Sequence, residues 1–248
     1  MNQYQDLLAR HDYAIIDRTI IGAEDWHDEL PLQDIVPKQM KNDVERTPKL
    51  LQLEMGAPHM ARVIENLDAA RKGREEYLFS CLLSAPDVAP DKMMLHLRKH
   101  LVFASKQGNG VLRFYDGRVF PHLLRMLYPS TLGAIFVPIR HWTFRLQDEW
   151  ISVPPPETNL VRRYWALDDK ERQRVDRIHR INQTLSKWQQ QHKRPWKDLD
   201  EFHARSEQVE QALLDAKNEA HLQDAGAQIA FALRVIETHE PQSWVKPQ

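Results

Sequence analysis

Val153-Pro154-Pro155-Pro156 is the stretch that decides how this 248-residue chain is divided. Consecutive prolines cannot donate the hydrogen bonds of a sheet, and they favour an extended, stiff connector. Before this stretch, short apolar runs alternate with helical patterns, whereas after it the apolar residues recur at helical spacing. The sequence therefore predicts an α/β lobe with a mixed sheet over residues 1–153 and an all-α lobe over residues 154–248.

The first part contains short runs rich in β-branched and aromatic residues, bounded by Gly, Pro, Asp or Ser, which is typical of strands. The predicted strands are 13–16, 50–53, 77–83, 101–104, 111–115, 134–139 and 141–146. Apolar residues at helical spacing predict helices at 57–72, 92–100 and 120–128. Gly and Asn within 106–110 predict a tight turn between two strands, because both residues tolerate positive φ.

Three helices are predicted in the second part. Asp168 and Glu171 form a capping box for the first, whose apolar stripe runs on to Trp188. The second begins near Asp198 or Asp200, and the third begins near Asp224.

Charge is divided along these helices. Residues 162–197 carry eleven Lys or Arg and four Asp or Glu, a net charge of +7, whereas residues 198–240 carry three and ten, a net charge of −7. The simpler interpretation is a basic helix antiparallel to an acidic one, with their facing edges paired. The alternative is an RNA-binding module in which the basic face of this segment binds RNA or an acidic partner. That face comprises Arg172, Arg174, Arg177 and Arg180.

Composition narrows the class of protein. Apolar residues make up 42% and charged residues 28% of the chain, which is typical of a soluble globular protein, and the net charge of −1 gives no general attraction to nucleic acid. Cys81 is the only cysteine, so no internal disulfide is possible and a reducing compartment is expected. No apolar run approaches the ~20 residues of a membrane span. We therefore expect a cytoplasmic protein with no membrane span and no nucleic-acid partner.

The sequence contains no recognisable catalytic motif. His96 and His100 have the i, i+4 spacing of a zinc helix, but position 97 is Leu, and His122 is the only nearby third candidate. We expect these histidines to be structural; the alternative is a small metal-dependent hydrolase. Nucleophile elbows, phosphate-binding loops and dinucleotide fingerprints are absent from the sequence. No enzyme activity, catalytic residue, metal or cofactor is expected.

Unusual side chains are densest in Arg113-Phe114-Tyr115-Asp116-Gly117-Arg118-Val119. If this segment is a strand, Arg113 and Tyr115 lie on one face and Phe114 on the other. Asp116 then pairs with Arg113 or Arg118 and fixes the turn into the following helix. A compatible functional interpretation is that these groups, with Arg98 from the preceding helix, form a polar anchor at the surface.

This segment also carries a family resemblance. His96-Leu97-Arg98, the glycine turn, the Arg113–Val119 segment, Phe136-Val137-Pro138-Ile139 and Trp142 follow one another in an order that resembles the effector-chaperone (adaptor) family of type VI secretion systems. Residues 13–17, 48–53 and 82–84 fit the same pattern, so the resemblance covers about residues 11–145. Two positions depart from it: Gly117 replaces a usual Pro, and Val137 replaces a usual Gly.

The resemblance implies a cytoplasmic helper that is not itself the toxin. Such a chaperone holds a cognate effector toxin, loads it onto the VgrG spike protein and stays behind. It also implies two lobes, one α/β and one helical. The residues expected to bind a partner, such as an amphipathic helix, are Arg98, Arg113, Phe114, Tyr115, Asp116, Arg118, Trp142 and Trp150. For Trp142 and Trp150 the alternative is that they are hydrophobic plugs.

Overall fold

The computed structural model describes residues 3–17, 29–73, 78–105, 108–158, 166–219, 222 and 224–238. The chain divides into two compact units, an N-terminal unit that ends at Asp168 and a helical unit that begins at Asp169. The division therefore falls after the proline stretch, which follows directly on the last strand of the sheet. Within the described residues, no helix combines the length and the apolar composition of a membrane span.

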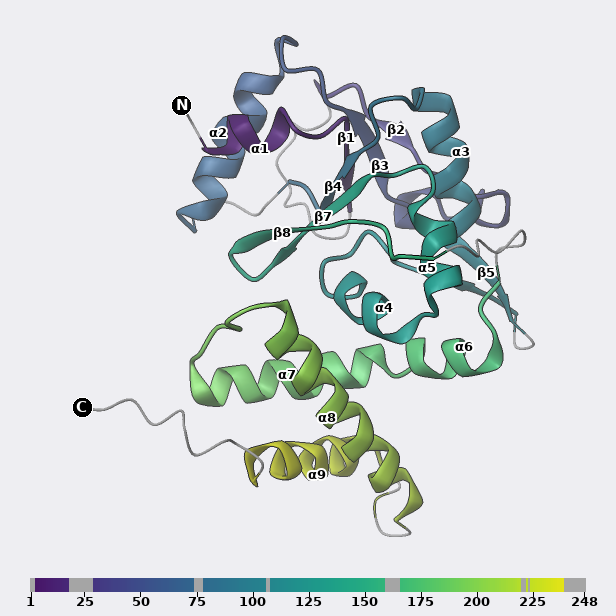
Figure 1. Cartoon of the computed structure of the whole chain (residues 1–248), viewed down its shortest axis with the longest axis vertical. Coiled ribbons are helices and arrows are strands. Elements are labelled where there is room, and N and C mark those ends of the chain that lie inside the picture. The colour runs from purple at the N-terminus through teal and green to yellow at the C-terminus, as the bar shows by residue number, and fades with distance from the viewer. Residues whose placement is uncertain are drawn as a thin grey trace. The chain divides into compact units, whose positions relative to one another are not determined.

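A six-stranded sheet forms the centre of the N-terminal unit (Figure 1). The strands lie in the order β2-β3-β1-β4-β7-β8. Their bounds are β1 Tyr13–Ile16, β2 Gln33–Asp34, β3 Lys49–Gln52, β4 Cys81–Ser84, β7 His141–Leu146 and β8 Glu149–Val153. The predicted fold class, an α/β lobe followed by an all-α lobe, is confirmed. The predicted mixed sheet is corrected, because each of these neighbouring strand pairs is antiparallel.

Helices cover both faces of this sheet, with α1 and α2 on one side and α3, α4 and α5 on the other (Figure 1). Their bounds are α1 Gln3–Leu8, α2 Met60–Arg71, α3 Pro90–Leu101, α4 Phe120–Met126 and α5 Pro129–Phe136. Two short 3₁₀ helices, η2 Lys38–Met40 and η3 Val44–Arg46, precede β3, and a hairpin of β5 (Val102–Ser105) and β6 (Gly108–Val111) follows α3. On the first face Leu8, Ile16 and Leu67 pack together. On the second, Phe120 stacks on Trp142 with ring centroids 4.8 Å apart.

Several sequence predictions match these elements. Strands 13–16 and 141–146 have the predicted bounds, and the predicted strands 50–53 and 101–104 lie within one residue of β3 and β5. Of the predicted strand 77–83, only the part from Cys81 is a strand, and Tyr77 lies outside the described residues, as do residues 106 and 107 of the predicted turn. The hairpin around that turn is present, with Ser105 opposite Gly108.

Two strand predictions are wrong. Residues 134–136 of the run 134–139 are the end of helix α5, and residues 137–139 follow that helix as a turn. Such a short apolar run cannot be told from a buried helix by its period. The run 111–115 leaves the hairpin after Val111, and the chain then turns twice before α4. The chain leaves the strand conformation because the Phe114 ring packs against Trp142. Asp116 accepts a hydrogen bond from the Arg118 amide, a local contact that takes the place of pairing with another strand.

The helical unit contains four described helices. They are α6 Asp169–Val175, α7 Ile178–His192, α8 Leu199–Asn218 and α9 Ala225–Thr238. The first predicted helix is thus broken in two after Val175, whereas α8 and α9 begin where predicted. Asp198 caps α8 by accepting a hydrogen bond from the Glu201 amide at 2.8 Å, and Asp224 accepts one from the Gly226 amide at 2.7 Å.

Candidate protein-binding site

Asp116 is the centre of a turn that leads from the β5–β6 hairpin into α4. Only 2% of the residue is exposed. One oxygen of its carboxylate accepts hydrogen bonds from the Arg118 amide at 2.9 Å and from Arg118 Nε at 3.0 Å, and the other accepts one from Arg118 Nη2 at 2.9 Å. Arg113 Nη2 lies 3.3 Å from the second oxygen. The predicted pairing of Asp116 with an arginine is confirmed, and both arginines take part.

Arg113 connects this turn to the end of strand β1. Its Nη2 also forms an ion pair with Asp17, whose side chain is only 3% exposed. The Asp17 amide donates to Ser80 Oγ at 3.2 Å, which holds the Asp17 backbone next to the start of β4. Asp17 was not among the predicted site residues. The signal that could have found it is a charged residue directly after a fully buried apolar strand.

The network keeps the arginines charged and the neighbouring phenol protonated. Hydrogen bonding to Asp116 raises the pKa of Arg118. Burial, together with the nearby charge of Asp17, raises the pKa of Tyr115. Because both carboxylates accept hydrogen bonds from guanidinium groups, the groups that this site offers to a partner are cationic donors.

Three arginines lie at one end of the sheet, and we call them the arginine cluster: Arg98, Arg113 and Arg118. The side chain of Arg118 is 64% exposed and that of Arg113 is 35% exposed. Arg98, exposed on α3, donates from Nη2 to the Asp34 carbonyl at 3.1 Å. Asp34 is opposite Lys49, and Lys49 is opposite Ile16, the residue before Asp17. The Asp34 carbonyl that anchors Arg98 therefore lies two strands, or about 10 Å, from the end of β1, where Asp17 binds Arg113.

The aromatic residues of the predicted site lie beneath this surface. Phe114, Tyr115 and Trp142 are each no more than 2% exposed. The Phe114 ring meets the edges of both others, with centroids 5.9 Å from Tyr115 and 5.6 Å from Trp142. In this conformation the three rings hold the turn in place and are not accessible to a partner, as the plug interpretation of Trp142 expects. Cys81 lies in the same core, where burial raises the pKa of its thiol.

Trp150 lies on the other face of the sheet. It is opposite Arg145 on β7, and Trp142 occupies a position of opposite parity on that strand, so the two indoles point to opposite faces. Trp150 packs partly buried against the α1–α2 core. The structure therefore does not bring Trp150 together with the arginine cluster.

His96 joins α3 to α5, whereas His100 bonds within α3. His96 Nε2 donates to the Ile135 carbonyl at 2.7 Å, and His100 Nδ1 donates to the His96 carbonyl at 2.8 Å. Burial lowers the pKa of His96 to about 4 and that of His100 to about 3, so both rings are neutral near pH 7. Over the described ranges, no three His, Cys, Asp or Glu side chains are grouped to hold a metal ion.

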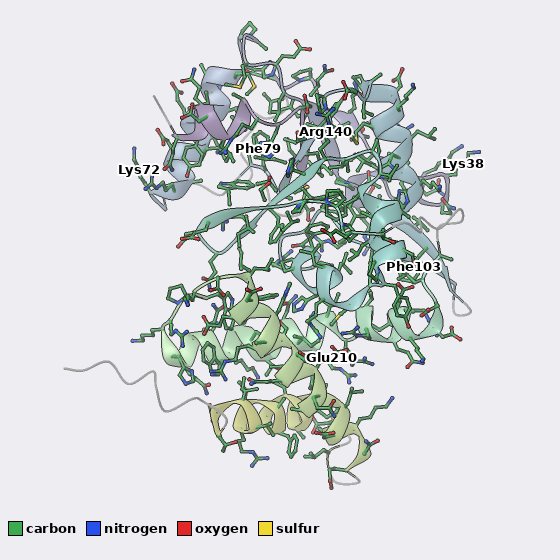
Figure 2. All side chains as sticks on the ribbon, viewed as in Figure 1. Lys38, Lys72, Phe79, Phe103, Arg140 and Glu210 are labelled. Carbon is green, nitrogen blue, oxygen red and sulfur yellow. The ribbon has the colours of Figure 1, made fainter. Side chains whose placement is uncertain are left out.

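The basic helix is paired within its own unit. Arg177 Nη2 lies 2.9 Å from Glu210 and Arg174 Nε lies 3.3 Å from it; Glu210 is labelled on α8 in Figure 2. Arg180 donates to Gln228 Oε1 at 2.9 Å. Because Arg194 pairs with Glu201 at the opposite end of the same helices, α7 and α8 are antiparallel, and the helix-pairing hypothesis is confirmed.

Comparison with known proteins gave no match. No protein-family model, no curated protein and no solved structure matches the chain. The resemblance to type VI effector chaperones therefore depends on the residues of the chain alone.

Proposed function

We propose that this chain is a cytoplasmic adaptor that binds a cognate type VI effector toxin and loads it onto the VgrG spike protein, without an enzymatic activity of its own. One observation carries the proposal: partly exposed arginines are held in place by two buried carboxylates within the segment that resembles the chaperone family. The two-unit architecture agrees with the same resemblance.

A guanidinium that is fixed before binding suits recognition of another polypeptide. Ordering a long side chain at an interface costs about 0.5–1.5 kcal/mol, and Arg113 and Arg118 are already ordered by Asp17 and Asp116. Arginine is also enriched among the residues that dominate binding energy, because its planar donors match carboxylates and carbonyls. We expect the partner segment to be a helix with acidic or carbonyl groups along its polar edge.

Two features make the alternative functions, a small hydrolase and an RNA-binding module, less favourable. The carboxylates of the site are occupied by arginines and are poorly placed to act as a general base. On the basic helix, Arg174 and Arg177 are paired with Glu210, which reduces the charge available for RNA.

The proposal is tested by co-purification with the spike protein and toxin encoded beside this gene. Arg98→Glu combined with Arg118→Gln removes two exposed cations, and we expect it to weaken capture of a partner at least about 10-fold, since each lost hydrogen bond to a charged group is worth about 1.5–3 kcal/mol. Arg113 is left intact, because it supports buried carboxylates.

Arg140→Glu is the matched control. Arg140, labelled in Figure 2, is 61% exposed and ion-paired with Asp87. Its amide donates to the Ser84 carbonyl at one end of β4, whereas Ser80 and Asp17 lie at the other end of that strand. Capture should be unchanged in this variant. Equal capture by the double variant and the wild type, or failure of the wild type to retain either neighbour, would contradict the proposal.

A further inference from the structure

A pocket of about 290 Å³ lies in the N-terminal unit, away from the arginine cluster. Its polar lining comes from four separate segments: Arg10 and His11 after α1, Ser84 at the end of β4, His141 and Thr143 on β7, and Ser152 on β8. Leu7 and Trp150 form apolar walls. None of these polar residues was among the predicted site residues.

The sheet register explains why these side chains converge. Ser84 is opposite His141, and Thr143 is opposite Ser152, so each pair shares a face. His141 and Thr143 are two residues apart on β7, which places both pairs on the same face. This is the face covered by α1, which ends at Leu8, and the His11 amide bonds to the Leu8 carbonyl.

A line of hydrogen bonds runs from the interior to this pocket. His11 Nδ1 lies 2.7 Å from the Leu7 carbonyl, which can only accept, so Nδ1 carries a proton. His11 Nε2 lies 2.7 Å from Thr143 Oγ1, and Thr143 Oγ1 lies 3.0 Å from Ser152 Oγ. Thr143 has a single hydroxyl proton, and therefore the direction of the whole line depends on the protonation state of His11.

Arg10 gives the lining of the pocket a permanent positive charge. Arg10 is exposed, and its Nε donates to the backbone carbonyl of Asp6 at 3.1 Å. Asp6, Asp12 and Glu149 are each adjacent in sequence to a lining residue, but none of them lines the pocket, and the Asp12 carboxylate accepts from the Ala85 amide at 2.7 Å. The described lining includes a guanidinium, two imidazoles and three hydroxyls, and it includes neither Asp nor Glu.

We propose that this pocket binds a small organic carboxylate, whose anionic end meets Arg10, His141 and Ser152 and whose apolar part lies against Trp150 and Leu7. Arginine presents paired donors that match the two oxygens of a carboxylate. The apolar walls favour an organic acid over inorganic phosphate, because burial of its apolar surface adds to binding. An indole beside polar anchors is a common lining of small-molecule sites.

Ligand binding should be linked to protonation of His11. Burial lowers the pKa of His11, so the ring is neutral near pH 7; Thr143 then donates to His11 and Ser152 donates to Thr143. Protonation of His11 reverses the direction of donation along these hydrogen bonds. His11 Nε2 then donates to Thr143 and Thr143 donates to Ser152, so the Ser152 hydroxyl proton becomes available to the anion. The charged or titratable groups that act on His11 are Arg10 and Asp12 beside it and His141 on β7. A bound anion favours the protonated ring, and its affinity therefore rises as pH falls.

Binding is measured by titrating benzoate into the full chain while following the indole N–H resonance of Trp150, identified by its loss in Trp150→Phe. We expect a saturable shift with benzoate and none with benzamide, its uncharged counterpart. Arg10→Gln should weaken benzoate binding at least about 5-fold, whereas Arg140→Gln, a neighbouring exposed arginine outside the pocket, should not. An equal shift with benzamide, no saturable shift, or tighter binding of inorganic phosphate would overturn the proposal.

The proton linkage has its own variants. Benzoate affinity at about pH 5.5 should exceed that at about pH 7.5, and the ratio should fall in His11→Gln and in Thr143→Val, which interrupts the line with a side chain of similar shape. His141→Gln should lower the affinity at both pH values but retain part of the ratio. An unchanged ratio in both His11→Gln and Thr143→Val would show that His11 is not linked to binding.

Discussion

At the scale of the residue, the two arginines of the Asp116 turn differ in what they support. Arg113 bonds to two buried carboxylates, Asp17 and Asp116, and its side chain is 35% exposed, whereas Arg118 bonds to Asp116 and its side chain is 64% exposed. A buried charge that loses its partner is strongly destabilising, while an exposed ion pair contributes little. Arg113 is therefore mainly a structural residue, and Arg118 is the one more available to a partner.

We expect Arg113→Ala to lower the free energy of unfolding by about 2–3 kcal/mol, less than the ~3–5 kcal/mol of a fully buried pair because the side chain is 35% exposed. Arg118→Ala should lower it by no more than about 1 kcal/mol, since the Arg118 amide still donates to Asp116. Urea unfolding of both variants measures the difference. Equal losses would contradict the distinction between the two residues.

Gly117 is required by a close approach of two backbones. A Cβ at this position would lie 2.7 Å from the Arg145 carbonyl oxygen on β7, and neither backbone can move without disturbing the sheet. Gly117→Ala should therefore destabilise the protein by about 1–3 kcal/mol. Gly56→Ala is the control, because its Cβ would meet nothing within 4 Å. Thermal unfolding compares the two variants, and a similar loss in both would argue against the clash.

At the scale of the element, sequence periodicity correctly predicted two of the strands that lie between two other strands of the sheet. β1 lies between β3 and β4 in the sheet and β7 lies between β4 and β8, and the bounds of both strands were predicted correctly. The 111–115 run failed because Phe114 and Asp116 satisfy tertiary contacts that outweigh strand propensity. The pairing of Asp17 with Arg113 and the assembly of the pocket could not be predicted from one sequence, since Arg113 and Asp17 are 96 residues apart and His11 and Thr143 are 132 apart.

Glu210 on α8 is 8% exposed and accepts from Arg174 in α6 and from Arg177, the residue before α7, so it joins α8 to the junction of α6 and α7. We expect Glu210→Gln to destabilise the helical unit by about 2 kcal/mol, because charged hydrogen bonds contribute about 1.5–3 kcal/mol. Glu207→Gln, on an exposed position of the same helix, should change stability by less than about 0.5 kcal/mol. Circular dichroism at 222 nm during urea unfolding follows the helices. No difference between the variants would mean that apolar packing alone sets the pairing of these helices.

At the scale of the whole molecule, buried histidines set the response of the N-terminal unit to acid. Burial lowers the pKa of His11, His96 and His100, all of which belong to this unit. Above the unfolded value of about 6.5, each ring is neutral in both states and pH has no effect through it. Below that value the unfolded chain takes up protons that the folded unit excludes, so stability falls with pH.

His100 provides the clearest test, since its folded pKa is about 3 and its ring is 2% exposed. Between about pH 7 and about pH 5 it should lower the free energy of opening by about 2 kcal/mol. Exchange of amide hydrogens in β4 and β7, corrected for the intrinsic effect of pH, measures that energy. His100→Phe removes the titration and should shrink the pH effect by about this amount. His179→Phe, an exposed position on α7, should leave it unchanged. An equally steep acid response in His100→Phe would place the protons elsewhere in the unit.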